Sequence, residues 1–383
     1  MIHTHYPDSP LGERTRAKTR RNPVSTASLT VPASEGANSG TRYAGPIWTL
    51  VLLAPLIAEV LSGSTRLSFL FAFIPETMVW GCGALLCREL VRRWRAGAAS
   101  LLLLGLALSI AEEFVIQQTS LAPLPFHGAN VEYGRLWGVN WLYFLFMLGY
   151  ESVWVVLVPV AVTELIFPAR RSQPWLRTRG FITACAVFVL GSYLAWYGWV
   201  KRARPKLHAL PYQPPVATIA AGVAAIVLLG WIAFAIRHTE PDKTGAARNP
   251  VSPWLIFFAA LVPSAAWFQV IALVFTPVRR PVWMPLTASF LGALLVCALF
   301  LRWSSARSGA HPWGDAQRWS AAFGAMLVSM GGGYLSTAGW SRADLIFKAI
   351  LNVLALIGLL WLGAEVRRRA TGHKPIKPPQ LFV

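Results

Sequence analysis

The sequence predicts an all-α, polytopic integral membrane protein with about ten transmembrane helices. Of its 383 residues, 55% are hydrophobic and only 13% are charged, whereas a soluble domain has about 25% charged residues. Apolar runs of roughly 20 residues recur between positions 46 and 364, and each is long enough to cross about 30 Å of hydrocarbon. A backbone exposed to lipid must satisfy its own hydrogen bonds, so these runs are expected to be helices.

The expected organisation is one helical membrane region between two polar tails. Residues 1–45 are rich in Ser, Thr, Pro, Gly and Arg and lack an apolar stretch, so they are expected to be a disordered basic cytoplasmic tail. A four-helix half that carries intramembrane carboxylates (46–180), a six-helix half (181–364) and a second basic cytoplasmic tail (365–383) follow. The expected spans are 46–63, 69–90, 98–120, 138–167, 180–200, 214–236, 254–275, 285–302, 319–338 and 345–364.

The net charge of +19 is interpreted as a topology signal and not as a nucleic-acid interface. The Lys and Arg residues form short clusters between the apolar runs, which is typical of cytoplasmic loops that contact anionic lipid headgroups. If the N-terminus is cytoplasmic, 25 of the 35 Lys and Arg residues lie inside and the remaining ten outside. The expected location is therefore the cytoplasmic (plasma) membrane with both termini inside. Lys201, Arg202, Arg204 and Lys206 oppose this trend, because they fall in an expected outer loop.

Acidic residues are the most informative feature, because a charge deep in a membrane helix costs about 2.5–3.5 kcal/mol even on lenient scales. The chain has only 16 Asp and Glu residues, yet six Glu residues lie within the first four expected spans. Five of them fall roughly 2–6 Å outward of the membrane midplane, at 1.5 Å per residue. Those five are Glu59, Glu76, Glu112, Glu113 and Glu151. The sixth, Glu164, lies near the cytoplasmic end.

Their common depth predicts a polar cavity between the first four helices. Ser109, Glu113 and Gln117 follow each other at i, i+4 and would line one helix face, so Gln117 joins the candidate site. Arg66 or Arg135 is expected near its mouth. The alternative is that each Glu is protonated and hydrogen-bonded between helices for structural reasons alone.

Other features have structural interpretations. The consecutive glycines Gly331, Gly332 and Gly333 favour close helix contact or a break in a helix. Lys348 is expected to extend to the interface, with pairing to a carboxylate as the alternative. The four cysteines have neither CxxC nor His-Cys spacing, so neither a zinc site nor a disulfide framework is indicated.

Three stretches of the first half resemble a group of uncharacterised bacterial multi-pass membrane proteins. They are APLIAEVLSGSTRL (54–67), GALLCRELVRRW (83–94) with LLLLGLALSIAEEF (101–114), and YGRLWGVNWLYF (133–144) with VPVAVTELIFP (158–168). The resemblance covers about 46–180 and implies no function. Glu112 and Glu113 also resemble the Glu-Glu-x-x-x-Arg motif of CPBP intramembrane proteases, although Gln117 replaces the Arg and no His lies in an expected span interior.

The favoured hypothesis is cation- or proton-linked binding or transport through the carboxylate-lined cavity of Glu59, Glu76, Glu112, Glu113, Gln117 and Glu151. Carboxylates suit cations, protons or an amine-bearing substrate. One alternative is an intramembrane hydrolase that uses the Glu112–Glu113 pair, and another is a non-catalytic membrane scaffold. Enzymatic activity is the less favoured class, and the sequence indicates no particular substrate, metal, cofactor or oligomeric state.

Overall fold

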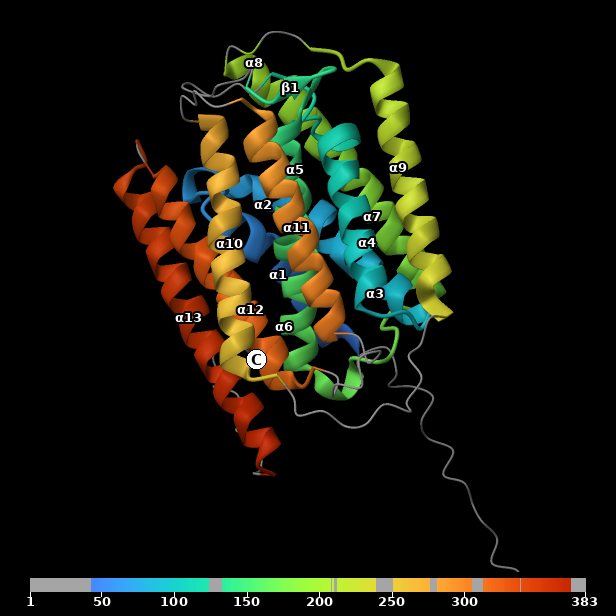
Figure 1. Cartoon of the computed structure of the whole chain (residues 1–383), viewed down its shortest axis with the longest axis vertical. Helices are drawn as coiled ribbons and strands as arrows, with labels where there is room; N and C mark the ends of the chain where they lie inside the picture. Colours follow the sequence, from blue (N-terminus) through green and yellow to red (C-terminus); the bar gives the residue numbers. More distant parts are fainter. Residues whose placement is uncertain are drawn as a thin grey trace, which may run out of the picture. The chain divides into compact units, whose positions relative to one another are not determined.

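The structure, a computed structural model, is a bundle of long α-helices (Figure 1). It describes residues 43–123, 133–207, 209, 212–238, 251–275, 281–304, 313–337 and 339–372. Nearly all of the expected basic N-terminal tail, and residues 373–383 of the C-terminal one, lie outside the described residues. The predicted fold class is confirmed.

The first four expected spans are helices that change type along their length. Span one combines α1 (Ala44–Pro55) with the π-helical turn η2 (Leu56–Leu61). Span two runs from the 3-10 turn η3 (Leu67–Ala72) through α2 (Phe73–Glu76) and the π-helical η4 (Thr77–Gly81) to α3 (Cys82–Arg93). Span three is α4 (Ala98–Ile110) with the π-helical η5 (Ala111–Ile116). Span four is α5 (Trp141–Tyr150), the π-helical η6 (Glu151–Leu157) and α6 (Val158–Ile166).

The rest of the chain is more regular. A short antiparallel hairpin, β1 (Arg135–Leu136) and β2 (Val139–Asn140), precedes α5, with Arg135 paired to Asn140. The short turns are η7 (Pro168–Arg170), η9 (Ile236–His238) and η11 (Gly333–Ser336). The later helices are α7 (Thr178–Trp196) continued by η8 (Tyr197–Ala203) and α8 (Arg204–Lys206), α9 (Val216–Ala235), α10 (Pro253–Phe275), α11 (Trp283–Ser304), α12 (Asp315–Gly332) and α13 (Arg342–Ala370).

Nine helices in the described part of the chain are long and apolar enough to cross a membrane. The expected span 319–338 corresponds to α12, which is not among the nine. Its first turn carries Asp315, Gln317 and Arg318, and these polar side chains lower the hydropathy of its 18 residues. It packs against α6, α10 and α13. The four basic residues from Lys201 to Lys206 continue the fifth helix and do not form a loop.

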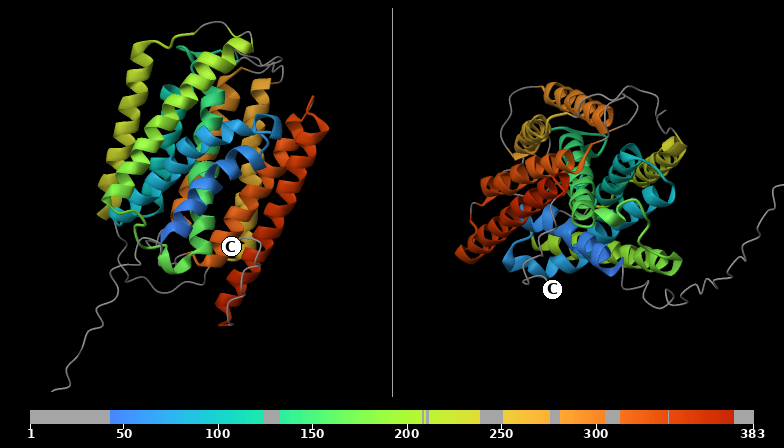
Figure 2. Two further views of the ribbon diagram at one scale, coloured as in Figure 1. Left: turned by 180° about the vertical axis from the view of Figure 1, so that it is seen from behind. Right: turned by 90° about the horizontal axis from the view of Figure 1, so that it is seen from below.

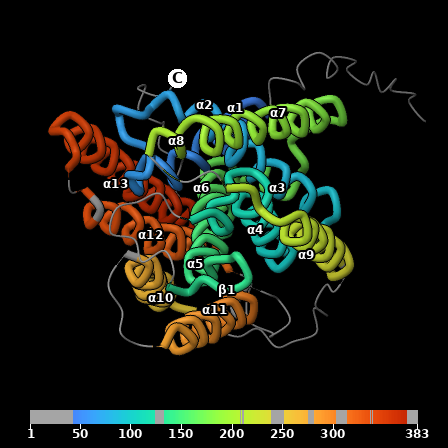
Figure 3. Tube along the Cα trace, turned by 90° about the horizontal axis from the view of Figure 1, so that it is seen from above, coloured from blue at the N-terminus to red at the C-terminus, as the bar shows by residue number. Residues whose placement is uncertain are grey.

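The first four spans form the centre of the bundle. Within them 44–67% of the residues are buried, against 0–22% in the other five apolar helices. Viewed along the bundle, α5 and α6 lie in the middle, with α7, α9, α11, α10 and α13 around them (Figure 3). Helix α9 packs on α4, α7 on η4 and α10 on α5. The later helices thus surround the segments that carry the carboxylates.

The connection between spans one and two lies inside the height of the bundle. In Figures 1 and 2 the segment around α2 is level with the upper end of α13, well below the hairpin β1–β2. This connection contains Gly63, whose φ of +96° suits glycine. The short first span therefore ends close to the carboxylates and not at the outer rim.

Candidate functional site

A π-helical turn occurs beside the carboxylate on each of the four helices that carry one. Glu59 lies in η2, Glu112 and Glu113 lie in η5, Glu151 is the first residue of η6, and Glu76 directly precedes η4. A π-helical turn is rare, generally inserts one residue into an α-helix, and is frequent at functional sites. The sequence analysis missed these turns.

The structure brings the five carboxyl groups together. Glu112 interacts electrostatically with Glu113, Glu59 and Glu76, and Glu151 interacts with Glu113, Glu112 and Glu59. Four of the five side chains belong to residues that are at most 7% exposed, and Glu59 is partly buried. We call these five residues the carboxylate cluster. That the cluster binds a ligand stays a prediction.

Neighbouring hydroxyl groups satisfy two members of the cluster in part. Thr65 Oγ1 donates a hydrogen bond to Glu76 Oε1. Glu113 Oε2 accepts hydrogen bonds from Thr119 Oγ1 at 2.9 Å and from Ser120 Oγ at 2.6 Å. Thr65, Thr119 and Ser120 come from the segments that follow spans one and three, so the connections complete the site.

Five further carboxylate oxygens of the cluster are buried without a hydrogen bond of regular geometry among the described residues. Both side-chain oxygens of Glu112, both of Glu151 and Oε2 of Glu76 are in this state. None of the ion pairs in the described part of the chain includes a member of the cluster. An ionised carboxylate in such surroundings is costly, so Glu112 and Glu151 require a proton or a bound cation.

Two tyrosines of α5, Tyr143 and Tyr150, lie beside the cluster. Tyr143 interacts electrostatically with Glu113, Glu151 and Glu59. Tyr150 donates its hydroxyl to the carbonyl oxygen of Ala58 in η2. The sequence analysis did not single out Tyr143, although it precedes Glu151 by eight residues, about two helical turns, and such spacing places both on one face.

The expected polar stripe on span three is not regular. Ser109 Oγ donates to the carbonyl oxygen of Met147 at 3.1 Å, whereas Glu113 is bonded to the segment that follows its own helix. Gln117 lies beyond the end of η5, and its backbone N–H donates to Glu112 O at 2.9 Å. Residues 111–116 form a π-helical turn, in which hydrogen bonds close over five residues. Ser109 and Glu113 nevertheless both interact with Glu151, and their common face with Gln117 stays a prediction.

Neither arginine expected at the mouth pairs with a carboxylate. The Arg66 guanidinium lies over the Trp340 ring at 4.9 Å, and Arg135 donates to the carbonyl oxygens of Leu121 and Gly138. Both guanidinium groups are engaged with aromatic or backbone partners, and the expectation that one of them lies near the mouth of the site stays a prediction.

A second buried charged group lies at the opposite end of the first four spans. Arg88 donates to Glu164 Oε1 at 3.2 Å and to Glu89 Oε1 at 3.0 Å, and its guanidinium stacks on Trp175 at 3.3 Å. Glu89 also accepts from the backbone N–H groups of Trp175 and Leu176, and Arg92 contacts both oxygens of Glu164. This group is well satisfied, unlike the carboxylate cluster, and it fastens the segment after α6 to α3.

A comparison with known protein families matches nearly the whole of the helical bundle described above. An uncharacterized membrane protein family has a profile that matches residues 49–371. The chain belongs to this uncharacterized membrane protein family. The match includes the carboxylate cluster, the Arg88 group and α13. Comparisons with curated proteins and with solved structures found no match.

Lys348 fulfils neither role expected from the sequence, which were extension to the membrane interface and pairing with a carboxylate. Its residue is 1% exposed, so it does not extend to the interface, and no ion pair in the described part of the chain includes it. Its ammonium group instead donates to the carbonyl oxygens of Leu61 and Met330. The glycines before it act in part as expected, because α12 ends at Gly332 and Gly333 touches the backbone of Ser62.

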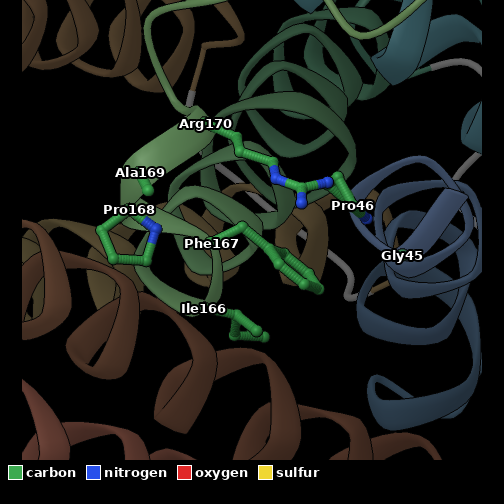
Figure 4. A pocket seen from close by; sticks show the side chains of 7 residues that line it. All are labelled: Gly45, Pro46, Ile166, Phe167, Pro168, Ala169 and Arg170. Atoms are coloured by element: carbon green, nitrogen blue, oxygen red, sulfur yellow. The ribbon is translucent and has the colours of Figure 1, made fainter. Parts of the chain in front are cut away.

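Neither a group of metal ligands nor an open hollow gives a second candidate site in the described part of the chain. Among the described residues, no three His, Cys, Asp or Glu side chains are grouped to hold a metal ion. A hollow of about 420 Å³ is lined by Gly45, Pro46 and residues 166–170 (Figure 4). Gly45 is the second residue of α1, and Glu59 lies 14 residues later in the same span, about 20 Å away at 1.5 Å per residue, so this hollow is separate from the cluster.

Proposed function

We propose that this membrane protein binds and releases protons at the carboxylate cluster, as part of proton-linked binding or transport of a solute. The observation that carries the proposal is the state of Glu112 and Glu151. Both are 2% exposed, and no hydrogen bond of regular geometry reaches either carboxyl group among the described residues, although the Ser109 hydroxyl lies close to Glu151. Both nevertheless interact with other carboxylates.

Electrostatics favours a proton at these positions. Five negative charges that lie close together repel one another, and this repulsion is many times stronger in a medium of low dielectric than in water. A proton on Glu112 relieves its interactions with Glu113, Glu59 and Glu76 together. Because the groups interact, they share protons as a set, and the charge of one changes the proton affinity of the others.

The hydroxyl groups around the cluster support proton movement between its members. A hydroxyl can donate one hydrogen bond and accept others, so it can exchange its donor between two carboxylates. Thr119 and Ser120 contact Glu113, and Tyr143 lies near Glu113, Glu151 and Glu59. The π-helical turns add backbone that departs from regular helix, a feature common where helices act in function.

The hydrolase alternative has less support. General-base catalysis by Glu112 or Glu113 would need a partner to protonate the leaving group. None of the seven His residues of the chain lies within the four spans that carry the cluster. The scaffold alternative predicts that the cluster has no titration linked to function.

Proton uptake after a pH jump separates these alternatives. The purified full-length chain, in lipid nanodiscs, is moved from alkaline to neutral pH, and a pH-indicator dye reports the protons bound per chain. We expect Glu112→Gln and Glu151→Gln each to take up fewer protons than the wild type, whereas the control Asp315→Asn, outside the cluster, does not differ. Equal uptake by the wild type and both cluster variants would support the scaffold instead.

A further inference from the structure

Lys348 places a buried ammonium group between two helix ends. Its Nζ donates to Leu61 O at 2.6 Å and to Met330 O at 3.2 Å. Leu61 is the last residue of η2, and Met330 lies two residues before the end of α12. The carbonyl end of a helix carries partial negative charge, so two helices direct this charge to one point.

Asn352 and Tyr334 complete the surroundings of the ammonium group. Asn352 lies one turn after Lys348 on α13. Its amide oxygen faces Lys348 Nζ at 3.2 Å while its amide nitrogen faces Leu61 O at 3.1 Å, the orientation that satisfies both groups. The ring centroid of Tyr334 lies 4.5 Å from Nζ, within the range of a cation–π contact. Three oxygens thus match the three N–H donors of the ammonium group.

Tight backbone contacts fix the positions of these oxygens. A Cβ on Gly333 would lie 1.5 Å from Ser62 O and 2.9 Å from Lys348 Nζ. Only a residue without a side chain allows the segment after α12 to approach the end of η2 so closely. The nearest acidic residue along α13, Asp344, instead accepts hydrogen bonds from Ser68 and Ser341.

We propose that Leu61 O, Met330 O and Asn352 Oδ1 form a receptor for a monovalent cation of the ammonium class, and that Lys348 fills it as a built-in cation. Backbone carbonyls at interrupted helices are the oxygens with which membrane transporters coordinate monovalent cations. Here a covalently attached ammonium occupies that position. The site is distinct from the carboxylate cluster and does not depend on its proposed function, although Leu61 and Glu59 share η2.

Chemical rescue tests this assignment. Lys348→Ala removes the three terminal methylenes and the ammonium group, which propylammonium replaces atom for atom. The full-length variant in nanodiscs is unfolded by heat with propylammonium or with tetramethylammonium at equal concentration. Tetramethylammonium has the same charge but no N–H donor. We expect the variant to unfold roughly 4 °C or more below the wild type, and propylammonium alone to reverse much of this loss.

Two further variants make the result decisive. In Lys348→Ala combined with Asn352→Leu, propylammonium is expected to lose most of its effect, because one of the three oxygens is gone. Lys348→Met keeps the side-chain volume without the charge, and it is expected to unfold below the wild type even if Lys348→Ala does not fold. Equal effects of the two cations on Lys348→Ala, or a Lys348→Met protein as stable as the wild type, would overturn the proposal.

Discussion

Glu112 and Glu151 lie on helices that pack against each other, and their carboxyl groups interact electrostatically. No hydrogen bond of regular geometry reaches either group among the described residues, although the Ser109 hydroxyl lies close to Glu151. Glu113, the residue next to Glu112, is instead held by Thr119 and Ser120. The carboxyl groups of the adjacent residues Glu112 and Glu113 therefore differ in the hydrogen bonds that they accept. From this difference we expect Glu112 and Glu151 to exchange protons and Glu113 to order the site.

Substitutions of the two neighbours are expected to differ in their effect on stability. Glu112→Gln removes a carboxyl group that is costly to ionise. It takes no acceptor away from a neighbouring donor, so the protein should unfold at the wild-type temperature or above it. Glu113→Ala leaves two buried hydroxyls without their acceptor and should cost about 1–3 kcal/mol. Thermal unfolding in nanodiscs measures both, and a large loss of stability in Glu112→Gln would contradict this assignment.

Arg88 is expected to be a structural residue. Arg88→Met leaves buried Glu89 with only the more distant Arg93 guanidinium, at 3.9 Å, and Glu164 with Arg92 alone, so we expect a loss of about 3–5 kcal/mol. Arg367→Met, on the exposed surface of α13, is the control and should change stability by less than about 0.5 kcal/mol. Urea or thermal unfolding of both variants checks this. Similar stability of the two would show that the buried group is not needed to fasten the segment after α6.

Gly81 is expected to be needed for the contact between spans one and two. A Cβ there would lie 2.1 Å from the carbonyl oxygen of Val51, and a backbone atom cannot move aside without displacing α1. Gly81→Ala should therefore lower the unfolding temperature and the yield of folded protein. Gly358→Ala, where a Cβ meets nothing within 4 Å, should be neutral or stabilising by up to about 1 kcal/mol. Equal behaviour of the two variants would contradict the close contact.

The sequence was sufficient for the fold class and for the burial of most acidic residues of the first four spans inside the protein. Both follow from the cost of placing polar groups in lipid, which any single chain must obey. A Glu residue near the midplane is too short to reach the interface, so its helix has to turn it toward the protein interior. Composition and spacing record that constraint directly.

The sequence was not sufficient for the details that define the site. The π-helical turns have no distinct composition, so they were not predicted from the sequence. Arg88 looked like one of several cytoplasmic basic residues, although it is fully buried. Lys348 is nearly 300 residues from its acceptor Leu61, and only the folded chain shows that these groups meet.

The topology stays a prediction that a reporter fusion can check. The distribution of Lys and Arg residues, 25 inside and ten outside, favours cytoplasmic termini at both ends. A C-terminal reporter that is active only in the cytoplasm should therefore be active in a bacterial host, and one that is active only in the periplasm should be silent. The reverse pattern would require an odd number of spans or an inverted protein.

The protonation of Glu112 and Glu151 tests the central claim most directly. Protonated carboxyl groups have a carbonyl stretching band in the infrared that ionised groups lack, so pH-difference spectra of the protein in lipid can report them. We predict such bands at neutral pH in the wild type, one lost in Glu112→Gln and one in Glu151→Gln, with no loss in Asp315→Asn. Identical spectra for the wild type and both cluster variants at every pH would show that these carboxyl groups bind no exchangeable proton, which contradicts the account.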